Sequence, residues 1–151
     1  MDEHCKWGGA MNILTKLMCV VTLALGLAGC GGTPMLTDTA WAFVSVGGQV
    51  VGKGDFSTMQ PMFRFLPDSS RIMGYGGCNQ FSGTFTQVKD VVKIGPLITT
   101  KRACPGMDTE AMILTAFDKT TKVQRDNDVL RFFSGDSVLM ECKAYAIPTK
   151  D

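Results

Sequence analysis

The feature that most limits the possible folds of this chain is a glycine-rich stretch at residues 74–85, which reads Gly-Tyr-Gly-Gly-Cys-Asn-Gln-Phe-Ser-Gly-Thr-Phe. From Phe81 onward, apolar residues and glycine alternate with polar residues, which is the period of an extended strand with two different faces. Gly76 and Gly77 permit a positive φ or a close approach to a neighbouring strand. The stretch therefore predicts a kinked strand that begins at a turn and holds Cys78 rigidly at its start.

Short alternating or β-branched segments recur along the chain and are separated by turn-forming residues. Short connections require mostly antiparallel pairing, because a parallel crossover needs a dozen or more residues. The sequence therefore predicts an antiparallel sheet of about eight short strands. We expect strands at 41–46 with a short continuation at 49–51, and at 62–66, 71–75, 81–87, 91–94, 123–125, 129–133 and 138–143.

The segment at residues 105–121 has a helical rather than an extended pattern. Its apolar stripe consists of Met107, Ala111, Leu114 and Phe117, at spacings of four, three and three. Pro105 suits a first turn, and Asp108 and Glu110 have the sign that the positive end of a helix dipole favours. One helix stripe must be buried against one sheet face, so we expect an α+β domain with a curved sheet.

An apolar segment near the N-terminus has the features of a secretory signal. Lys16 precedes an uncharged run from Leu17 to Ala28, which is too short to span a membrane because a spanning helix needs roughly 20 residues. The run ends in Leu-Ala-Gly-Cys, which resembles the bacterial lipobox, in which the cysteine becomes the lipidated first residue. We expect residues 1–29 to be a leader and lipoprotein signal peptide, and Cys30 to carry palmitate or a related lipid. The alternative is a buried apolar helix followed by a structural cysteine.

Residues 1–10 do not fit the positive start of a signal segment, since Asp2 and Glu3 have the wrong sign. We expect translation to start at Met11 and residues 1–10 to be a mis-called extension. His4 is the only histidine of the chain, and cleavage before Cys30 removes it with either start.

The expected mature chain runs from residue 30 to 151, which is 151 minus 29, or 122 residues, enough for one domain. Residues 30–38 are expected to be the lipidated cysteine and a tether, and residues 146–151 a tail. The formal net charge of +1 gives no reason to expect nucleic acid as a partner. Gly31 and Gly32 lack the aspartate of inner-membrane sorting rules in Gram-negative lipoproteins, so the resemblance to those rules favours the outer membrane, facing the periplasm.

Paired motifs in the chain resemble those of the META domain (HslJ-like) family, which includes bacterial lipoproteins. The first motif is the glycine-rich turn and strand, and the second is the segment before the helix. The matching residues are Gly76, Gly77, Cys78, Asn79, Phe81, Gly83 and Phe85, then Ile94, Pro96, Leu97, Thr99, Thr100, Ala103, Cys104, Pro105 and Glu110. Phe85 stands where tyrosine is common in the family. The resemblance assigns residues 39–145 to a META domain.

The resemblance implies a strongly curved antiparallel β-sheet, a half or cracked barrel, wrapped around one α-helix. Family members are often secreted or lipid-anchored, and no enzyme chemistry is securely attached to them. The resemblance thus defines the fold more closely than the function.

The cysteines limit the covalent structure of the expected mature domain. After loss of the leader and lipidation of Cys30, the cysteines left are Cys78, Cys104 and Cys142, and two of these should pair in an oxidising envelope. The family resemblance favours Cys78–Cys104, because both lie at rigid turns within the family motifs. Cys104–Cys142 is the rival pairing. Cys142 is otherwise expected to be buried in a strand.

Catalytic and metal sites find little support in the sequence. Without a mature histidine, the Ser-His-Asp and Cys-His arrangements are excluded, and a zinc site would need all three remaining cysteines to converge. Asp126, Asp128 and Asp136 suggest calcium, but two hairpin turns explain them better. Lys101 and Arg102 are expected in a solvated turn, with an anion contact as the alternative. We expect no metal and no cofactor.

Apolar content is the better indication of function. Seven methionines lie in the expected mature chain, and methionine suits adaptable apolar contacts. A bent sheet around one helix can leave an apolar groove. We therefore expect a non-enzymatic envelope lipoprotein that binds an apolar ligand or an envelope protein, in assembly or stress response. Two alternatives stay open, namely a structural envelope protein without a ligand and an enzyme with an unrecognised site.

Overall fold

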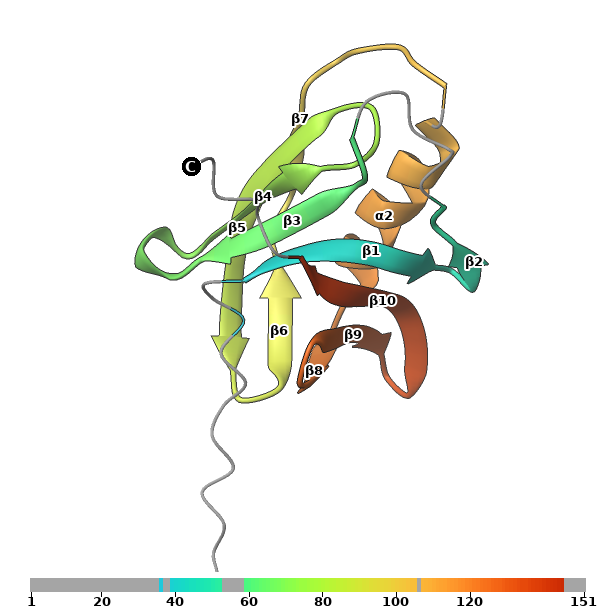
Figure 1. The fold of residues 1–151 in the computed structure, drawn as a ribbon. Coiled ribbons are helices and arrows are strands. Elements are labelled where there is room, and N and C mark those ends of the chain that lie inside the picture. The colour runs from blue at the N-terminus through green and yellow to red at the C-terminus, as the bar shows by residue number, and fades with distance from the viewer. Residues whose placement is uncertain (1–35, 37–38, 53–58, 106, 146–151) are drawn as a thin grey trace, which may run out of the picture. The chain divides into compact units, whose positions relative to one another are not determined.

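The computed structural model describes residues 36, 39–52, 59–105 and 107–145 of the chain. These residues form ten strands, one α-helix and one short 3-10 helix (Figure 1). The strands are β1 (Ala40–Val46), β2 (Gln49–Val50), β3 (Met62–Leu66), β4 (Arg71–Tyr75), β5 (Gln80–Val88), β6 (Val91–Ile94), β7 (Ile98–Thr99), β8 (Lys122–Asp126), β9 (Val129–Ser134) and β10 (Ser137–Tyr145). The helix α2 spans Met107–Lys119, and the 3-10 helix η2 spans Pro67–Ser69.

Eight of the strands close into an antiparallel barrel, in the order β1-β3-β4-β5-β6-β8-β9-β10 and back to β1. The short strands β2 and β7 pair with β1 and β5 outside this ring. The antiparallel sheet with one helix is as predicted, but the half or cracked barrel is wrong. The first and last strands pair along six residue pairs, from Ala40–Tyr145 to Val46–Met140, and this pairing shuts the sheet.

The curvature that closure requires comes partly from irregular pairing of β10. A register shift lies between Phe43 and Ser45 of β1, where it pairs with β10. A second shift lies between Val138 and Met140 of β10, where it pairs with β9. An extra residue in one strand bends it and increases its twist, which is how many sheets turn into barrels.

The shortest strand pairing in the barrel ring is that between β6 and β8. Their only register pair among the described residues is Val91–Lys122. Two backbone hydrogen bonds flank it, from Val92 N to the Thr121 oxygen at 3.1 Å and from Val123 N to the Asp90 oxygen at 2.8 Å. β7 and α2 lie between these two strands in the sequence, so the chain makes a long crossover from one to the other.

The barrel interior is filled by phenylalanine rings. Phe117 of α2 is fully buried and meets the rings of four strands, with centroid distances between 5.2 and 5.9 Å. Its four partners are Phe43, Phe63, Phe81 and Phe132. Two further rings, Phe65 and Phe85, continue the cluster at a centroid distance of 4.6 Å. The helix therefore packs its buried face into the barrel core.

The helix is oriented differently from the predicted stripe. Phe117 is buried and Leu114 is partly buried, as expected, but Met107 and Ala111 are exposed. The buried helix residues are Glu110, Ile113, Ala116 and Phe117. The predicted stripe was wrong because it counted only apolar residues, whereas the buried face of the helix includes the Glu110 carboxylate, which is hydrogen-bonded to the turn between β4 and β5.

No helix in the described part of the chain is both long and apolar enough to cross a membrane. Cys30, the leader and the tail at 146–151 lie outside the described residues.

Candidate functional site

The glycine-rich turn between β4 and β5 is shaped by two glycines with different roles. Gly77 has a φ of 112°, which a side chain would strain. Gly76 approaches α2 so closely that a Cβ there would lie 2.8 Å from Cγ of Glu110. The Tyr75 hydroxyl donates a hydrogen bond of 2.6 Å to the Gly77 carbonyl. The turn therefore needs glycine once for its backbone and once for the helix beside it.

Glu110 joins the helix to this turn. Its side chain lies in the first turn of α2 and is only 6% exposed. One carboxylate oxygen accepts hydrogen bonds from the backbone nitrogens of Cys78 at 3.3 Å and Asn79 at 2.6 Å. The other oxygen accepts from Nδ2 of Asn79 at 2.9 Å. A buried carboxylate thus satisfies three donors that the turn leaves without strand partners.

Asn79 extends the same network to the segment that precedes the helix. Its Oδ1 accepts from the Thr100 hydroxyl at 2.8 Å and from the Arg102 nitrogen at 2.7 Å. Its Nδ2 also donates to the Arg102 carbonyl at 3.2 Å. The Thr100 hydroxyl in turn accepts from the Gln80 nitrogen at 3.2 Å. The side-chain amide of Asn79 is therefore engaged at both its oxygen and its nitrogen.

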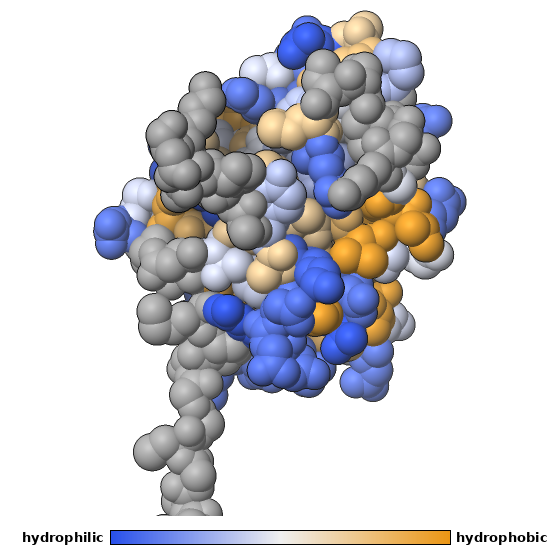
Figure 2. Space-filling view, in the orientation of Figure 1, coloured by the Kyte–Doolittle hydropathy of each residue, from blue (hydrophilic) through white to orange (hydrophobic). Residues whose placement is uncertain are grey.

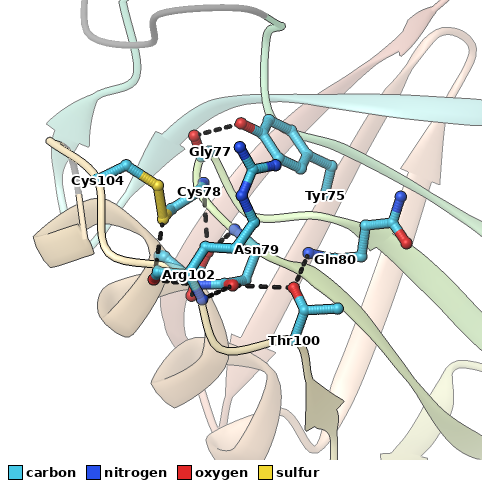
Figure 3. The surroundings of a disulfide bond; sticks show 9 residues. Tyr75, Gly77, Cys78, Asn79, Gln80, Thr100, Arg102 and Cys104 are labelled. Carbon is cyan, nitrogen blue, oxygen red and sulfur yellow. Dashed lines mark hydrogen bonds between the residues drawn. A yellow bond between two sulfur atoms is a disulfide. The ribbon is translucent and has the colours of Figure 1, made fainter.

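A disulfide between Cys78 and Cys104, the pair favoured from the sequence, closes the cluster, with a Cα–Cα distance of 5.8 Å (Figure 3). The Cys78 sulfur lies 3.3 Å from the Arg102 carbonyl oxygen. The bond spans 26 residues, and closing a loop of that size contributes roughly 3 kcal/mol in the chain-entropy description. It therefore reinforces covalently what Glu110 and Asn79 hold by hydrogen bonds.

This polar cluster has the character of a clamp rather than of a reactive centre. Every buried side-chain nitrogen and oxygen in the described part of the chain has a hydrogen-bond partner. All three hydrogen bonds of the Glu110 carboxylate come from groups of the protein itself. The residues that the family motifs singled out here, Gly77, Asn79, Thr100 and Glu110, come together to fix the helix against the barrel.

The other motif residues lie around the clamp. Phe81 is buried against Phe117, and Gly83 faces Leu97 so closely that a Cβ would lie 2.7 Å from a Leu97 methyl carbon. Pro105 is exposed two residues before the helix begins. These residues shape the core and the entry to the helix.

Asp126, Asp128 and Asp136 lie in or beside two hairpin turns. No group of three or more metal-binding side chains occurs in the part of the chain that the structure describes. Asn127 has a φ of 52° and Gly135 a φ of 57°, as tight hairpin turns require. Asp128, in the turn between β8 and β9, pairs with Lys143 of β10 at 3.5 Å, and both side chains are exposed. Hairpin turns thus account for Asp128 and its neighbours.

Cys142 is a free thiol in the barrel wall. It lies in β10 and is fully buried. Burial, together with the neighbouring Glu141 carboxylate, raises the pKa of the Cys142 thiol well above its ordinary value. The protonated form is therefore favoured, and the thiol is unsuited to nucleophilic chemistry.

We predict that Cys142 reacts with thiol reagents only after the chain unfolds. We also predict that ionisation of this thiol lowers the free energy of unfolding at alkaline pH. The pKa of the Cys142 thiol is higher in the folded chain than in the unfolded chain, where it is about 8.5. The thiol's contribution to the free energy of unfolding is therefore fully present below the unfolded pKa and is lost as the pH rises above it. Urea unfolding between pH 7 and 10 measures this, in a chain with Cys5→Ser, Cys19→Ser and Cys30→Ser. Adding Cys142→Val should remove that part of the alkaline loss. Rapid labelling of the folded chain at pH 8 would contradict the prediction.

A groove of about 500 Å³ lies on the outer face of β3, β4, β5 and β7. The strand registers place one row of outward side chains across all four strands. The row consists of Arg64, Met73, Ser82 and Ile98, each paired directly with the next. Directly paired residues point to the same face of a sheet, so these side chains form a continuous band.

A second row lies beside the first and is mainly apolar or uncharged. Met62 pairs with Tyr75, and Tyr75 pairs with Gln80. Met59 adds a further methionine to the lining. Alternation along β3 puts Met62 and Arg64 on the same side of the strand, and the fold makes this side one wall of the groove.

A smaller hollow of about 330 Å³ lies between α2 and the β1–β10 pair, next to Gly47. In the view of Figure 2, an apolar area lies at the right, where Figure 1 places β2 and the adjoining part of β10. Val50 and Val138 are exposed on these two strands. The barrel interior is packed with buried side chains, so this hollow lies at the surface, where α2 meets the β1–β10 pair.

Fold and clamp together define a small β-barrel domain whose helix α2 is fixed by a disulfide and a buried carboxylate. The chain belongs to the META domain family, because the family model of the META domain matches residues 34–144. No curated protein matches the chain.

Two solved structures share the fold. An NMR structure of a protein from Burkholderia xenovorans is 20% identical, has a TM-score of 0.60, and is matched over 76% of this chain and 87% of that chain. A second NMR structure is 18% identical, has a TM-score of 0.59, and is matched over 74% of this chain and 93% of that chain. At these identities the similarity establishes the fold alone.

Proposed function

We propose that this META domain protein is a non-enzymatic lipoprotein of the cell envelope that binds an apolar ligand or partner in its outer groove. The observation that carries the proposal is the concentration of exposed apolar side chains on one sheet face. Ile98, Met59 and Met73 are 76%, 48% and 38% exposed, and all three line the groove. Large apolar side chains gathered in one hollow are typical of a binding surface.

The polar cluster supports a binding rather than a catalytic role. The buried carboxylate of Glu110 and the amide of Asn79 are saturated by contacts within the protein. The thiol of Cys142 is enclosed in the barrel wall. The side chains whose chemistry could serve catalysis are therefore enclosed within the fold, and the open surface offers mainly apolar contacts.

The sequence supports a lipid anchor at Cys30. The family match begins at residue 34, four residues beyond this cysteine. A lipid chain contributes about 0.8 kcal/mol for each buried methylene, so more than one chain would hold the protein at the membrane. An outer-membrane anchor facing the periplasm would suit a role in envelope assembly or stress response. Entry of labelled palmitate into a Cys30→Ser chain, or its failure to enter the wild type, would contradict the anchor.

Groove binding is tested with an uncharged amphiphile, octyl glucoside, added below its micelle concentration. The full-length chain is held in phosphatidylcholine nanodiscs and carries ¹³C-labelled methionine methyl groups. We expect the methyl signals of Met59, Met62 and Met73 to shift, while that of Met107 stays unchanged. Met107 is 48% exposed but does not line the groove, so it reports non-specific binding.

A matched pair of substitutions makes this test specific. Ile98→Glu places a charge in the groove and should weaken binding about tenfold, since it removes an apolar contact and adds a group that must be desolvated. Val138→Glu makes the same change at an exposed strand position outside the groove and should leave binding unchanged. Equal effects of the two substitutions, or shifts at Met107 alone, would overturn groove binding.

A further inference from the structure

Two arginines lie at one end of the outer groove. Arg64 is paired with Met73, and Arg71 lies two residues away from Met73 on the same strand, so the arginines are diagonal neighbours on one face. Diagonal neighbours of this kind lie roughly 7–8 Å apart, within reach of long side chains. Both are exposed, and no Asp or Glu is among the described residues that line the groove. The groove therefore combines an apolar band with an uncompensated positive end.

Both guanidinium groups are directed at the same row of the sheet. Nη2 of Arg64 lies 3.8 Å from the sulfur of Met73, and Nη2 of Arg71 lies 3.5 Å from the hydroxyl oxygen of Ser82. Met73 and Ser82 are directly paired on neighbouring strands, so the two guanidinium groups approach the same pair of residues. Each guanidinium has five N–H donors and each of these contacts is long, so donors remain for the oxygens of an anion.

We propose that the groove binds a single-chain amphiphile with an anionic head group, such as a fatty acid or a lysophospholipid. This rests on the proposed function and names the ligand class. The head group lies between Arg64 and Arg71. The hydrocarbon chain lies along Met62, Met59 and Ile98, where flexible thioether side chains adapt to it. A volume of about 500 Å³ lies within the usual range of small-molecule sites.

The sheet favours this ligand over an extended peptide. Peptides that bind sheets usually add a strand to a free edge, because backbone hydrogen bonds supply much of the affinity. Each of the eight barrel strands has a neighbour on both sides, and among the described strands that line the groove only β7, with two residues, lies outside the ring. The groove therefore offers side chains to a ligand rather than a backbone edge.

The test compares probes that share a tail or a head group. The full-length chain in phosphatidylcholine nanodiscs, with labelled methionine methyl groups, is titrated with octyl phosphate, octyl glucoside, octyltrimethylammonium and inorganic phosphate. We expect octyl phosphate to bind about tenfold more tightly than octyl glucoside, and octyltrimethylammonium to bind more weakly than either. Inorganic phosphate should bind too weakly to measure. Raising the salt from 50 mM to 500 mM should reduce the preference for octyl phosphate, since the arginines are solvent-exposed.

Charge-neutral variants identify the arginines. The double variant Arg64→Gln, Arg71→Gln should bind octyl phosphate and octyl glucoside within about twofold of each other. The control variant Lys93→Gln, Lys143→Gln also removes two exposed positive charges, but from outside the groove, and should keep the tenfold preference. A preference that survives in the arginine variant would overturn the proposal.

The outcomes separate this proposal from groove binding in general. If octyl glucoside and octyl phosphate shift the groove methionines equally, the groove binds apolar ligands but the head-group inference is wrong. If neither shifts them, the proposed function fails as well. An apolar hexapeptide ending in two aspartates is added as a further probe, and tighter binding of this peptide than of octyl phosphate would replace the amphiphile with a protein partner.

Discussion

Replacing Phe117 with alanine is expected to lower the free energy of unfolding by about 4 kcal/mol, a typical cost for removing a buried phenylalanine. The ring is fully buried and meets four other rings from β1, β3, β5 and β9. Its loss leaves a cavity at the place where the helix enters the aromatic cluster. The neighbouring rings are held by closed strands, so they cannot easily collapse into the space. Urea unfolding followed by circular dichroism measures the loss.

The matched control for Phe117→Ala is Met107→Ala on the same helix. The sequence stripe placed both residues on one buried face, but Met107 is 48% exposed. We therefore expect a loss within about 0.5 kcal/mol for Met107→Ala, as for most surface substitutions. Similar losses of stability for the two variants would indicate that Met107 and Phe117 share one buried face, as the sequence pattern predicted, and would contradict the observed orientation of the helix.

Glu110→Ala is the second substitution with a large expected effect, again about 4 kcal/mol. It removes the buried acceptor of the two backbone N–H groups of Cys78 and Asn79 and of one N–H of the Asn79 side-chain amide. Each unsatisfied buried donor costs about 1–3 kcal/mol. Thermal and urea unfolding under oxidising conditions measure the effect with the Cys78–Cys104 bond intact.

Two controls separate the clamp from simple loss of charge at a helix start. Asp108→Ala removes an exposed acid from the same first turn and should cost within about 0.5 kcal/mol. Glu110→Gln keeps the shape but directs an NH₂ group at one set of donors, so it should also destabilise strongly. A Glu110→Ala loss as small as that of Asp108→Ala would show that the carboxylate does not hold the turn.

Local patterns predicted the strands well because alternation is a property of neighbouring residues. The expected strands at 62–66, 71–75 and 91–94 have the observed bounds. The two possibilities for Gly76 and Gly77, a positive φ and a close approach, are both realised, one at each glycine. Closure of the barrel could not be predicted in this way, because it depends on pairing between the first and last strands.

The candidate sites were predictable to different degrees. The motif residues Asn79, Thr100 and Glu110 were singled out by resemblance, but their mutual contacts depend on three segments that only the fold brings together. The outer groove was missed because alternation within a strand shows which side chains share a face but not whether the outer faces of β3, β4, β5 and β7 together form a hollow. The clue was the alternation in β3, where Arg64 interrupts apolar residues on the outward face.

The pairing of β1 with β10 has a consequence for the connectivity of the fold. Ala40 lies directly opposite Tyr145, and paired residues in antiparallel strands have Cα atoms about 4.5–5.5 Å apart. The barrel sequence therefore begins and finishes at the same point of the ring. A short linker could join these two residues, and new termini could be opened at the exposed Lys89 turn without removing a strand. We therefore expect a circularly permuted chain with these new termini to form the same ring of strands.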